Sequence, residues 1–227
     1  MARNENPPWG RGDTFYNLFT ATTQSTSDGI QYEGKEWVFE DINPNTKAYR
    51  SGQYVTCRAV RNVSGIALLP GRLAKFAAGA LAANGAPGGV YGGQVDGYVN
   101  TTPTANFNDL NARGYPIDEF LPTAGAQDKD LFWVVVKGPA GILTDLATLS
   151  PSILVGDRVV GQTAATSQAT TAGRIVDINA NTASATIMAA NADLFIGYAM
   201  SGPAGAATTA ATANNTNGSV LVYVVDH

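Results

Sequence analysis

The sequence is poor in the side chains that enzymes most often use for catalysis. Its 227 residues include one histidine, His227, and one cysteine, Cys57. A Ser-His-Asp triad, a cysteine–histidine pair or a histidine-based metal site needs an imidazole held inside the fold, and His227 is the last residue. A single cysteine also leaves no internal disulfide and no multi-cysteine metal cluster. We therefore expect a protein that is not an enzyme and that holds no cofactor or metal.

Charge is also scarce. Charged residues make up 14% of the chain and the formal net charge is −4, whereas an average soluble domain has about 25% charged residues. No basic cluster is dense enough to neutralise a row of phosphates. The N-terminus lacks the apolar core of a signal peptide, and the apolar runs at 132–136 and 220–225 are too short to span a bilayer. We expect neither a nucleic-acid nor a membrane partner, and synthesis in a cytoplasm.

The remaining catalytic candidates are carboxylates that lie close together along the chain. A glycosidase needs two carboxylates across a cleft, which neighbouring positions alone do not indicate. We interpret these acids as solvated loop residues. They are Glu33, Glu36, Glu40, Asp41, Asp118, Glu119, Asp128 and Asp130. The adhesion-like tripeptide Arg11-Gly12-Asp13 is interpreted as a plain turn.

From about residue 50 onward the chain has the rhythm of short strands separated by turn residues. This spacing predicts a mostly β protein, built as one or more small antiparallel β-barrel or sandwich domains. The last strand is apolar at consecutive positions and is expected to be buried on both faces. The segment 73–83 fits either a helix or a strand. The expected strands are 36–40, 53–60, 66–69, 94–100, 131–137, 158–161, 174–178, 183–188, 194–200 and 219–225.

The N-terminal region is expected to be an extended arm, because prolines and glycines interrupt it. Three regions follow: 1–50 is the arm with a strand that leads into the β region, 51–130 is β-rich with long Gly/Pro loops, and 131–227 is the antiparallel barrel or sandwich. The arm contains an apolar stretch that needs a surface to pack on, either on its own domain or on a neighbouring subunit. Its candidate contact residues are Phe15, Tyr16, Leu18 and Phe19.

Several segments together carry a resemblance to a known family. They are Glu36-Trp37-Val38-Phe39-Glu40-Asp41, Arg50-Ser51-Gly52, residues 57–70, 137–141, 155–159 and 195–200, and the terminal run 220–225. These segments resemble the head decoration proteins of tailed bacteriophages. The resemblance implies a structural cement protein that binds the outside of the assembled capsid, at junctions between copies of the major capsid protein. It also implies a homotrimer or a dimer located on the virion exterior. Deletion of residues 1–20 is then expected to weaken capsid binding and leave the C-terminal β domain folded.

Two other functions remain open at this point. The first is a tail or fibre component, which would use the same β modules and arm. The second is a carbohydrate-binding or adhesion module, with Trp9, Trp37 and Trp133 as candidate sugar platforms. Tryptophan more often fills a core, and we expect this of Trp133 because it lies within an apolar strand.

Overall fold

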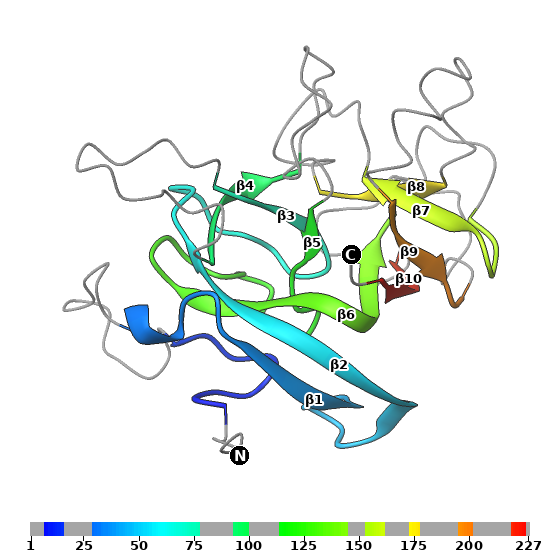
Figure 1. The fold of residues 1–227 in the computed structure, drawn as a ribbon, viewed down its shortest axis with the longest axis horizontal. Coiled ribbons are helices and arrows are strands. Elements are labelled where there is room, and N and C mark those ends of the chain that lie inside the picture. Colours follow the sequence, from blue (N-terminus) through cyan, green and yellow to red (C-terminus); the bar gives the residue numbers. More distant parts are fainter. Residues whose placement is uncertain are drawn as a thin grey trace, which may run out of the picture.

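The computed structural model describes residues 7–15, 29–77, 93–99, 114–144, 153–161, 173–177, 195–201 and 219–225. Within these residues the protein is mostly β, as expected, with one short 3₁₀ turn, η2, at Ile30–Tyr32 (Figure 1). None of the described segments forms a helix of the length and hydrophobicity needed to cross a membrane. The strands are β1 (Glu36–Ile42), β2 (Tyr49–Asn62), β3 (Leu73–Phe76), β4 (Gln94–Tyr98), β5 (Tyr115–Pro116), β6 (Leu131–Leu143), β7 (Arg158–Gly161), β8 (Ile175–Asp177), β9 (Phe195–Ala199) and β10 (Ser219–Val224).

The strands form one large mixed sheet that is not closed by strand ladders. Its order is β5-β3-β4-β2-β6-β10-β9-β7-β8, and β1 pairs with β2 beside this path. Most pairs are antiparallel, but β2 and β4 are parallel, so the sheet is mixed and not purely antiparallel as expected. Single bridges between Ile117 and Val134 and between Thr144 and Ile175 bring both ends of the sheet back to β6.

Strand β6 belongs to both halves of the sheet. Its first part pairs with β2, up to the Thr56–Lys137 pair, and the part from Gly138 onward pairs with β10. Gly138 marks the change of partner with φ of +98°, and a Cβ there would collide with the carbonyl oxygen of Tyr54. A residue with a side chain would be strained in this conformation. The three regions expected from the sequence therefore share one sheet.

Pro139 lies in the middle of β6, and its missing N–H removes no hydrogen bond between β6 and β10. The N–H groups of Gly141 and Leu143 point away from β10, to the Glu119 side chain and the Gly71 carbonyl. Because backbone groups alternate along a strand, the position of Pro139 also faces away from β10, and its carbonyl is met by Arg50. Proline lacks an N–H, and here the missing donor does not belong to the ladder.

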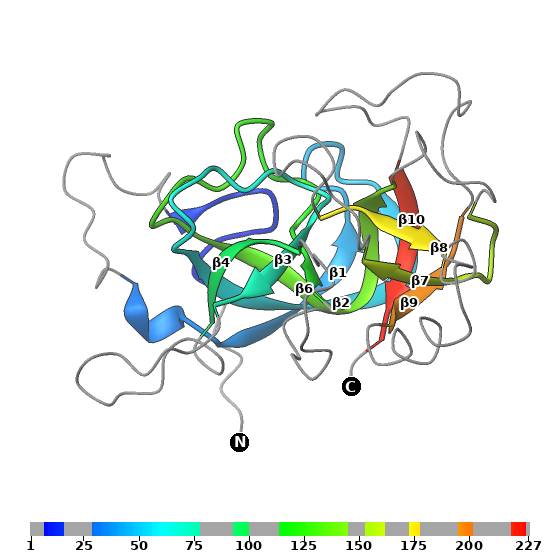
Figure 2. The ribbon, with the colours of Figure 1, turned by 90° about the horizontal axis from the view of Figure 1, so that it is seen from above.

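The core lies on both faces of β6, and each face is covered by its own apolar cluster. Trp133 and Val135 belong to one apolar cluster, which runs into the C-terminal strands, and Phe132 and Val134 belong to a second cluster beneath β3, β4 and β5. This double burial explains the unbroken apolar run at 132–136. Figure 2 shows the same arrangement from above, with β6 between the two groups of strands.

Several expectations about individual strands need correction. Alternate residues of strand β10 are half-exposed, so this strand is buried on one face only. The expectation that both of its faces are buried was wrong. Residues 66–69 form no strand; Asn62 donates to the Ile66 carbonyl (2.7 Å) and closes a turn, leaving a single bridge at Leu68. The described part of 73–83 is strand β3, and 183–188 lies outside the described residues.

Candidate functional site

The described part of the N-terminal region is packed into the core and is not a free arm. Trp9 is buried and stacks on Trp133, with ring centroids 4.7 Å apart and an interplanar angle of 27°. The Trp133 indole N–H also donates to the Trp9 carbonyl, at 3.3 Å. Phe15 is buried against Trp9 and Tyr32, at centroid distances of 5.5 and 5.9 Å. Residues 7–15 thus cover one end of the core.

Arg11 fixes this segment electrostatically. Its guanidinium donates to Asp118 Oδ1 through Nε (3.2 Å) and Nη2 (3.0 Å), and the Gly12 N–H donates to Asp118 Oδ2 (2.7 Å). Asp41 lies 3.5 Å from Arg11 Nη1, and the Phe120 ring lies beneath the guanidinium. Burial alone would lower the pKa of Arg11, but Asp118 and the neighbouring carboxylates outweigh it and hold the pKa above its ordinary value.

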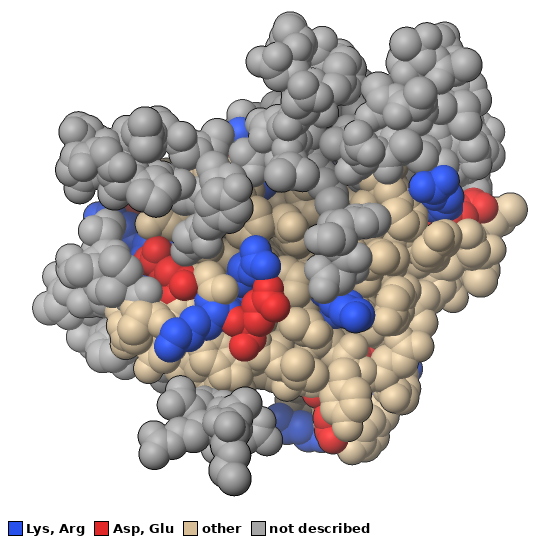
Figure 3. All heavy atoms as spheres, in the orientation of Figure 1, with Lys and Arg blue, Asp and Glu red and all other residues tan. Residues whose placement is uncertain are grey.

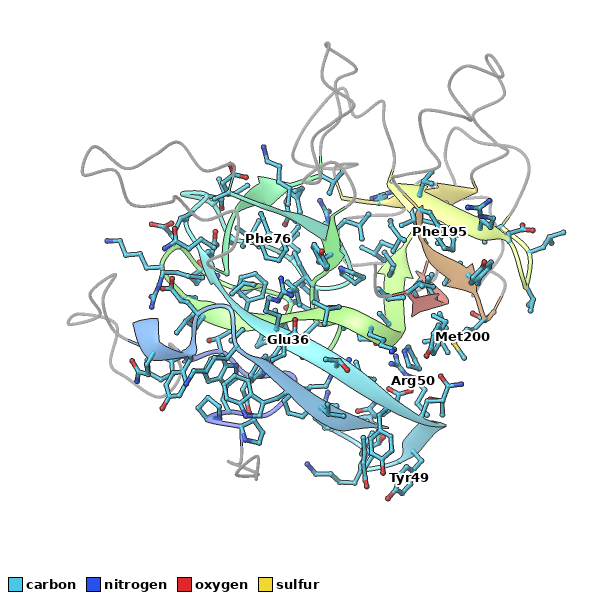
Figure 4. The ribbon with its side chains drawn as sticks, in the orientation of Figure 1. Glu36, Tyr49, Arg50, Phe76, Phe195 and Met200 are labelled. Atoms are coloured by element: carbon cyan, nitrogen blue, oxygen red, sulfur yellow. The ribbon has the colours of Figure 1, made fainter. Side chains whose placement is uncertain are left out.

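Arg50 joins the same group from strand β2. It binds Asp41 with both Nε (3.1 Å) and Nη2 (2.7 Å), and its Nη1 binds Glu119. Glu119 also accepts the Gly141 N–H of β6, at 2.9 Å. The two arginines and three carboxylates, which we call the arginine cluster, join the N-terminal segment to β1, β2, the 118–120 turn and β6. Figure 4 shows Arg50 at this junction.

The arginine cluster corrects the interpretation of the acids as solvated. The side chains of Asp41 and Asp118 are fully buried, and Asp130 is also buried. The partner of Asp118 is Arg11, 107 positions earlier in the chain, so sequence proximity could not reveal this pair. The interpretation of Arg11-Gly12-Asp13 as a turn is confirmed, since the Asp13 N–H meets the Gly10 carbonyl at 3.4 Å. A buried Arg11 is not available to an adhesion receptor.

The ion pairs and hydrogen bonds of the arginine cluster stabilise the contacts between these chain segments. The cluster contains no imidazole or thiol that would serve as a base or nucleophile. Across the described ranges, no group of three or more His, Cys, Asp or Glu side chains is arranged to hold a metal ion. The absence of enzymatic activity remains a prediction.

Cys57 should be chemically silent in the native protein. Its thiol is fully buried on the inward face of β2, and burial raises its pKa far above the ordinary value. Because the thiolate is the reactive form, we expect an aromatic disulfide reagent to label Cys57 only when the chain unfolds. Labelling rates across a denaturant series should follow unfolding measured by circular dichroism. Complete labelling in denaturant is the control, and rapid labelling in native buffer would contradict the expected burial.

The contact residues predicted for the arm fall into two groups. Phe15 packs on its own domain, which is the first of the two alternatives considered for this apolar stretch. Tyr16, Leu18 and Phe19 lie outside the described residues, so their role stays a prediction. The candidate sugar platforms pack together instead: Trp9 and Trp133 are buried, and Trp37 is partly buried against Trp133.

One exposed apolar surface lies on the β1–β2 hairpin. Val38, Tyr49 and Tyr54 are each 63–70% exposed, and they surround Glu40, so we call these four residues the hairpin patch. The strand register places Glu40 opposite Tyr54, and the Tyr49 hydroxyl donates to Glu40 at 3.2 Å. Glu40 forms no ion pair within the described part of the chain. Figure 4 shows Tyr49 at the outer end of the hairpin, pointing away from the body.

A second exposed apolar surface surrounds the turn before β7. Leu154, Val155 and Tyr198 are 46–68% exposed, and Arg158 pairs with Tyr198 across the strands; these four residues are the turn patch. The Arg158 guanidinium lies 4.7 Å from the Phe195 ring centre and makes no ion pair with any residue that the structure describes.

The turn that carries Leu154 and Val155 is rigidly held. The Asp157 N–H meets the Leu154 carbonyl (3.1 Å), and Asp157 Oδ2 accepts the Leu154 N–H (2.6 Å). Two further backbone bonds, at 2.8 and 2.9 Å, tie Gly156 and Asp157 to Ala199. Gly156 has a φ of +92°, which favours glycine. The turn therefore presents the apolar side chains of Leu154 and Val155 in a fixed conformation.

Neither patch was identified from the sequence, although a signal for the first was present. Because successive side chains of a strand point to opposite faces, Val38 lies on the face opposite to Trp37 and Phe39. In the same way, Tyr54 lies on the face opposite to Val55. Once the larger aromatic pair faces the core, Val38 has to face outward. Figure 3 shows small groups of both charges on a largely uncharged surface, which agrees with the low charge of the chain.

Comparisons with protein-family models, with curated proteins and with solved structures returned no match for this chain.

Proposed function

We propose that the protein is a structural virion component, a decoration or cement protein that binds the outer surface of an assembled tailed-phage head. Its partners are the major capsid protein, at the junctions between capsid subunits, and further copies of itself in a trimer or a dimer. The segments that resemble head decoration proteins, among them 36–41 and 155–159, support this proposal.

The observation that carries the proposal is the pair of exposed apolar patches, the hairpin patch and the turn patch, among the described residues. Large apolar side chains that remain exposed in a group mark surfaces that another protein covers. Tyrosine and arginine, which lie in these patches, are enriched where proteins dock. Repeated over a capsid, such small contacts add up to a large stabilisation through avidity.

We also propose that each half of the sheet closes into a small barrel around β6. The bridges from Ile117 to Val134 and from Thr144 to Ile175 support closure of the two halves. In this form the sheet would leave few free edges, which suits a protein that must not aggregate through strand pairing. The contact role proposed for Tyr16, Leu18 and Phe19 of the arm concerns residues outside the described part of the chain.

Purified heads that lack the protein provide the test. We expect the recombinant chain to co-sediment with them and to raise the temperature at which they release DNA, measured by dye fluorescence. The chain should be found on heads of the intact virion by immunogold labelling. If the chain does not bind heads and the antibody labels tails, the result supports the tail or fibre alternative. Competable hits on a glycan array would support the carbohydrate-binding alternative.

A further inference from the structure

We propose that copies of this protein associate head to tail, with the hairpin patch of one copy docked on the turn patch of the next. The contact pairs the carboxylate of Glu40 with the guanidinium of Arg158 within a shared apolar surround. This inference rests on the proposed function for its biological setting and deepens it by naming the contact between copies.

The two patches are complementary in composition. The hairpin patch has three exposed apolar or aromatic side chains around one carboxylate, and the turn patch has three around one guanidinium. Within the described residues neither Glu40 nor Arg158 has an ion-pair partner. The partly buried arginines Arg50 and Arg58, by contrast, are paired within the chain with Asp41 and Glu36. Charge complementarity of this kind selects the partner and fixes its orientation.

The same charges disfavour a symmetric contact. If the hairpin patch met its own copy across a two-fold axis, two Glu40 carboxylates would face each other, and the turn patch would likewise oppose two Arg158 side chains. Like charges in such a position are costly. A contact between two different patches is heterologous, and it closes into a ring when the rotation allows.

The positions of the patches suit a ring. The turn between β1 and β2 and the turn at 153–157 project from different parts of the body in the two perpendicular views (Figures 1 and 2). One copy can therefore offer its hairpin patch to one neighbour and its turn patch to another. A ring of three copies uses both patches of every copy and agrees with the trimer of the proposed function.

Solution mass provides the test, without any capsid present. By sedimentation velocity and light scattering on the full chain, we expect a trimer that dissociates on dilution. The variants Glu40→Arg and Arg158→Glu should each weaken association by at least about tenfold. The double variant Glu40→Arg/Arg158→Glu should restore it, because the charges are exchanged and the pair is rebuilt. This rescue also shows that the single variants did not lose association by unfolding.

A matched control is Asp128→Arg, a charge reversal at an exposed residue outside both patches, which should assemble like the parent. A species of one or two chains at high concentration, or single reversals that leave the mass unchanged, would overturn the inference. So would single defects that the double variant fails to rescue. If the ring forms but the chain does not bind heads, the proposed function fails and the inference stands; binding to heads by a strict monomer gives the reverse result.

Discussion

Replacement of Trp9 by alanine is expected to lower the free energy of unfolding by about 3–5 kcal/mol. The indole is buried and stacked on Trp133, so its loss leaves a cavity at the end of the core. It also removes an aromatic pair, which adds to the cost of lost burial. A change of this size is a large part of the roughly 5–15 kcal/mol that stabilises a typical domain. Chemical denaturation followed by tryptophan fluorescence and circular dichroism would measure it.

The matched control is Tyr49→Ala, measured with both variants diluted to the monomer, where this aromatic ring is 70% exposed. Its effect should stay within about 0.5 kcal/mol, because surface substitutions of this kind change little. If Trp9→Ala behaved like Tyr49→Ala, residues 7–15 would not be part of the folded core.

The same packing changes the design of a truncation experiment. Removing residues 1–20 was expected to leave the C-terminal β domain folded, but it also removes Trp9, Arg11 and Phe15 from the core. Loss of partner binding after that deletion would then report unfolding as much as loss of a contact. A deletion that ends at Asn6 keeps the packed segment and tests the first residues alone.

Replacement of Arg11 by methionine should cost about 3–5 kcal/mol, because it leaves a fully buried Asp118 without its cation. Methionine keeps much of the length of the side chain, so the effect is chiefly that of the lost charge and its hydrogen bonds. Equilibrium unfolding in urea would measure the change. Arg58→Met is the control: its ion pair with Glu36 is partly exposed, and breaking it should cost about 0–1 kcal/mol.

A double variant identifies the source of this cost. When Asp118→Asn is added to Arg11→Met, the buried charge disappears, so the double variant should be less destabilised than the sum of the two single variants by about 0.5–3 kcal/mol. Simple additivity would mean that Arg11 and Asp118 do not interact, contrary to their hydrogen bonds of 3.0 and 3.2 Å.

Much of the strand content was predictable because strand formation follows local patterns. The strand at 158–161 was predicted with its observed bounds, and the burial of Cys57 follows from alternation along β2. The sheet order was not predictable, since it depends on pairs such as Ala59 with Trp133 that are distant in the chain. The extension of β6 through Gly138 and Pro139 was missed because these residues normally end a strand.

The candidate surfaces were less predictable than the strands. Apolar residues such as Leu154 and Val155 cannot be told from core residues by their type alone. Their position at the tip of a turn exposes them. The arginine cluster was hidden for the opposite reason: Asp118 lies beside turn residues and looked solvated, but Arg11, more than a hundred positions earlier, covers it. Neither the exposure of this turn nor the burial of Asp118 could be predicted from the sequence, because burial is set by tertiary contacts.

The sharing of β6 between the two halves has a consequence for how the chain is made. During synthesis β2 emerges long before β6, so Ala59 waits for Trp133 until roughly 70 further residues have been added, about 4–15 s at ordinary rates of translation. Until then β2 can pair with β1 along one edge, but the edge that later pairs with β6 has no partner strand. The C-terminal strands then pair with the same β6, so neither half completes its sheet independently of it. Long-range pairing of this kind slows folding, and a nascent chain with an uncovered β2 is the stage at which a ribosome-associated chaperone would protect it most.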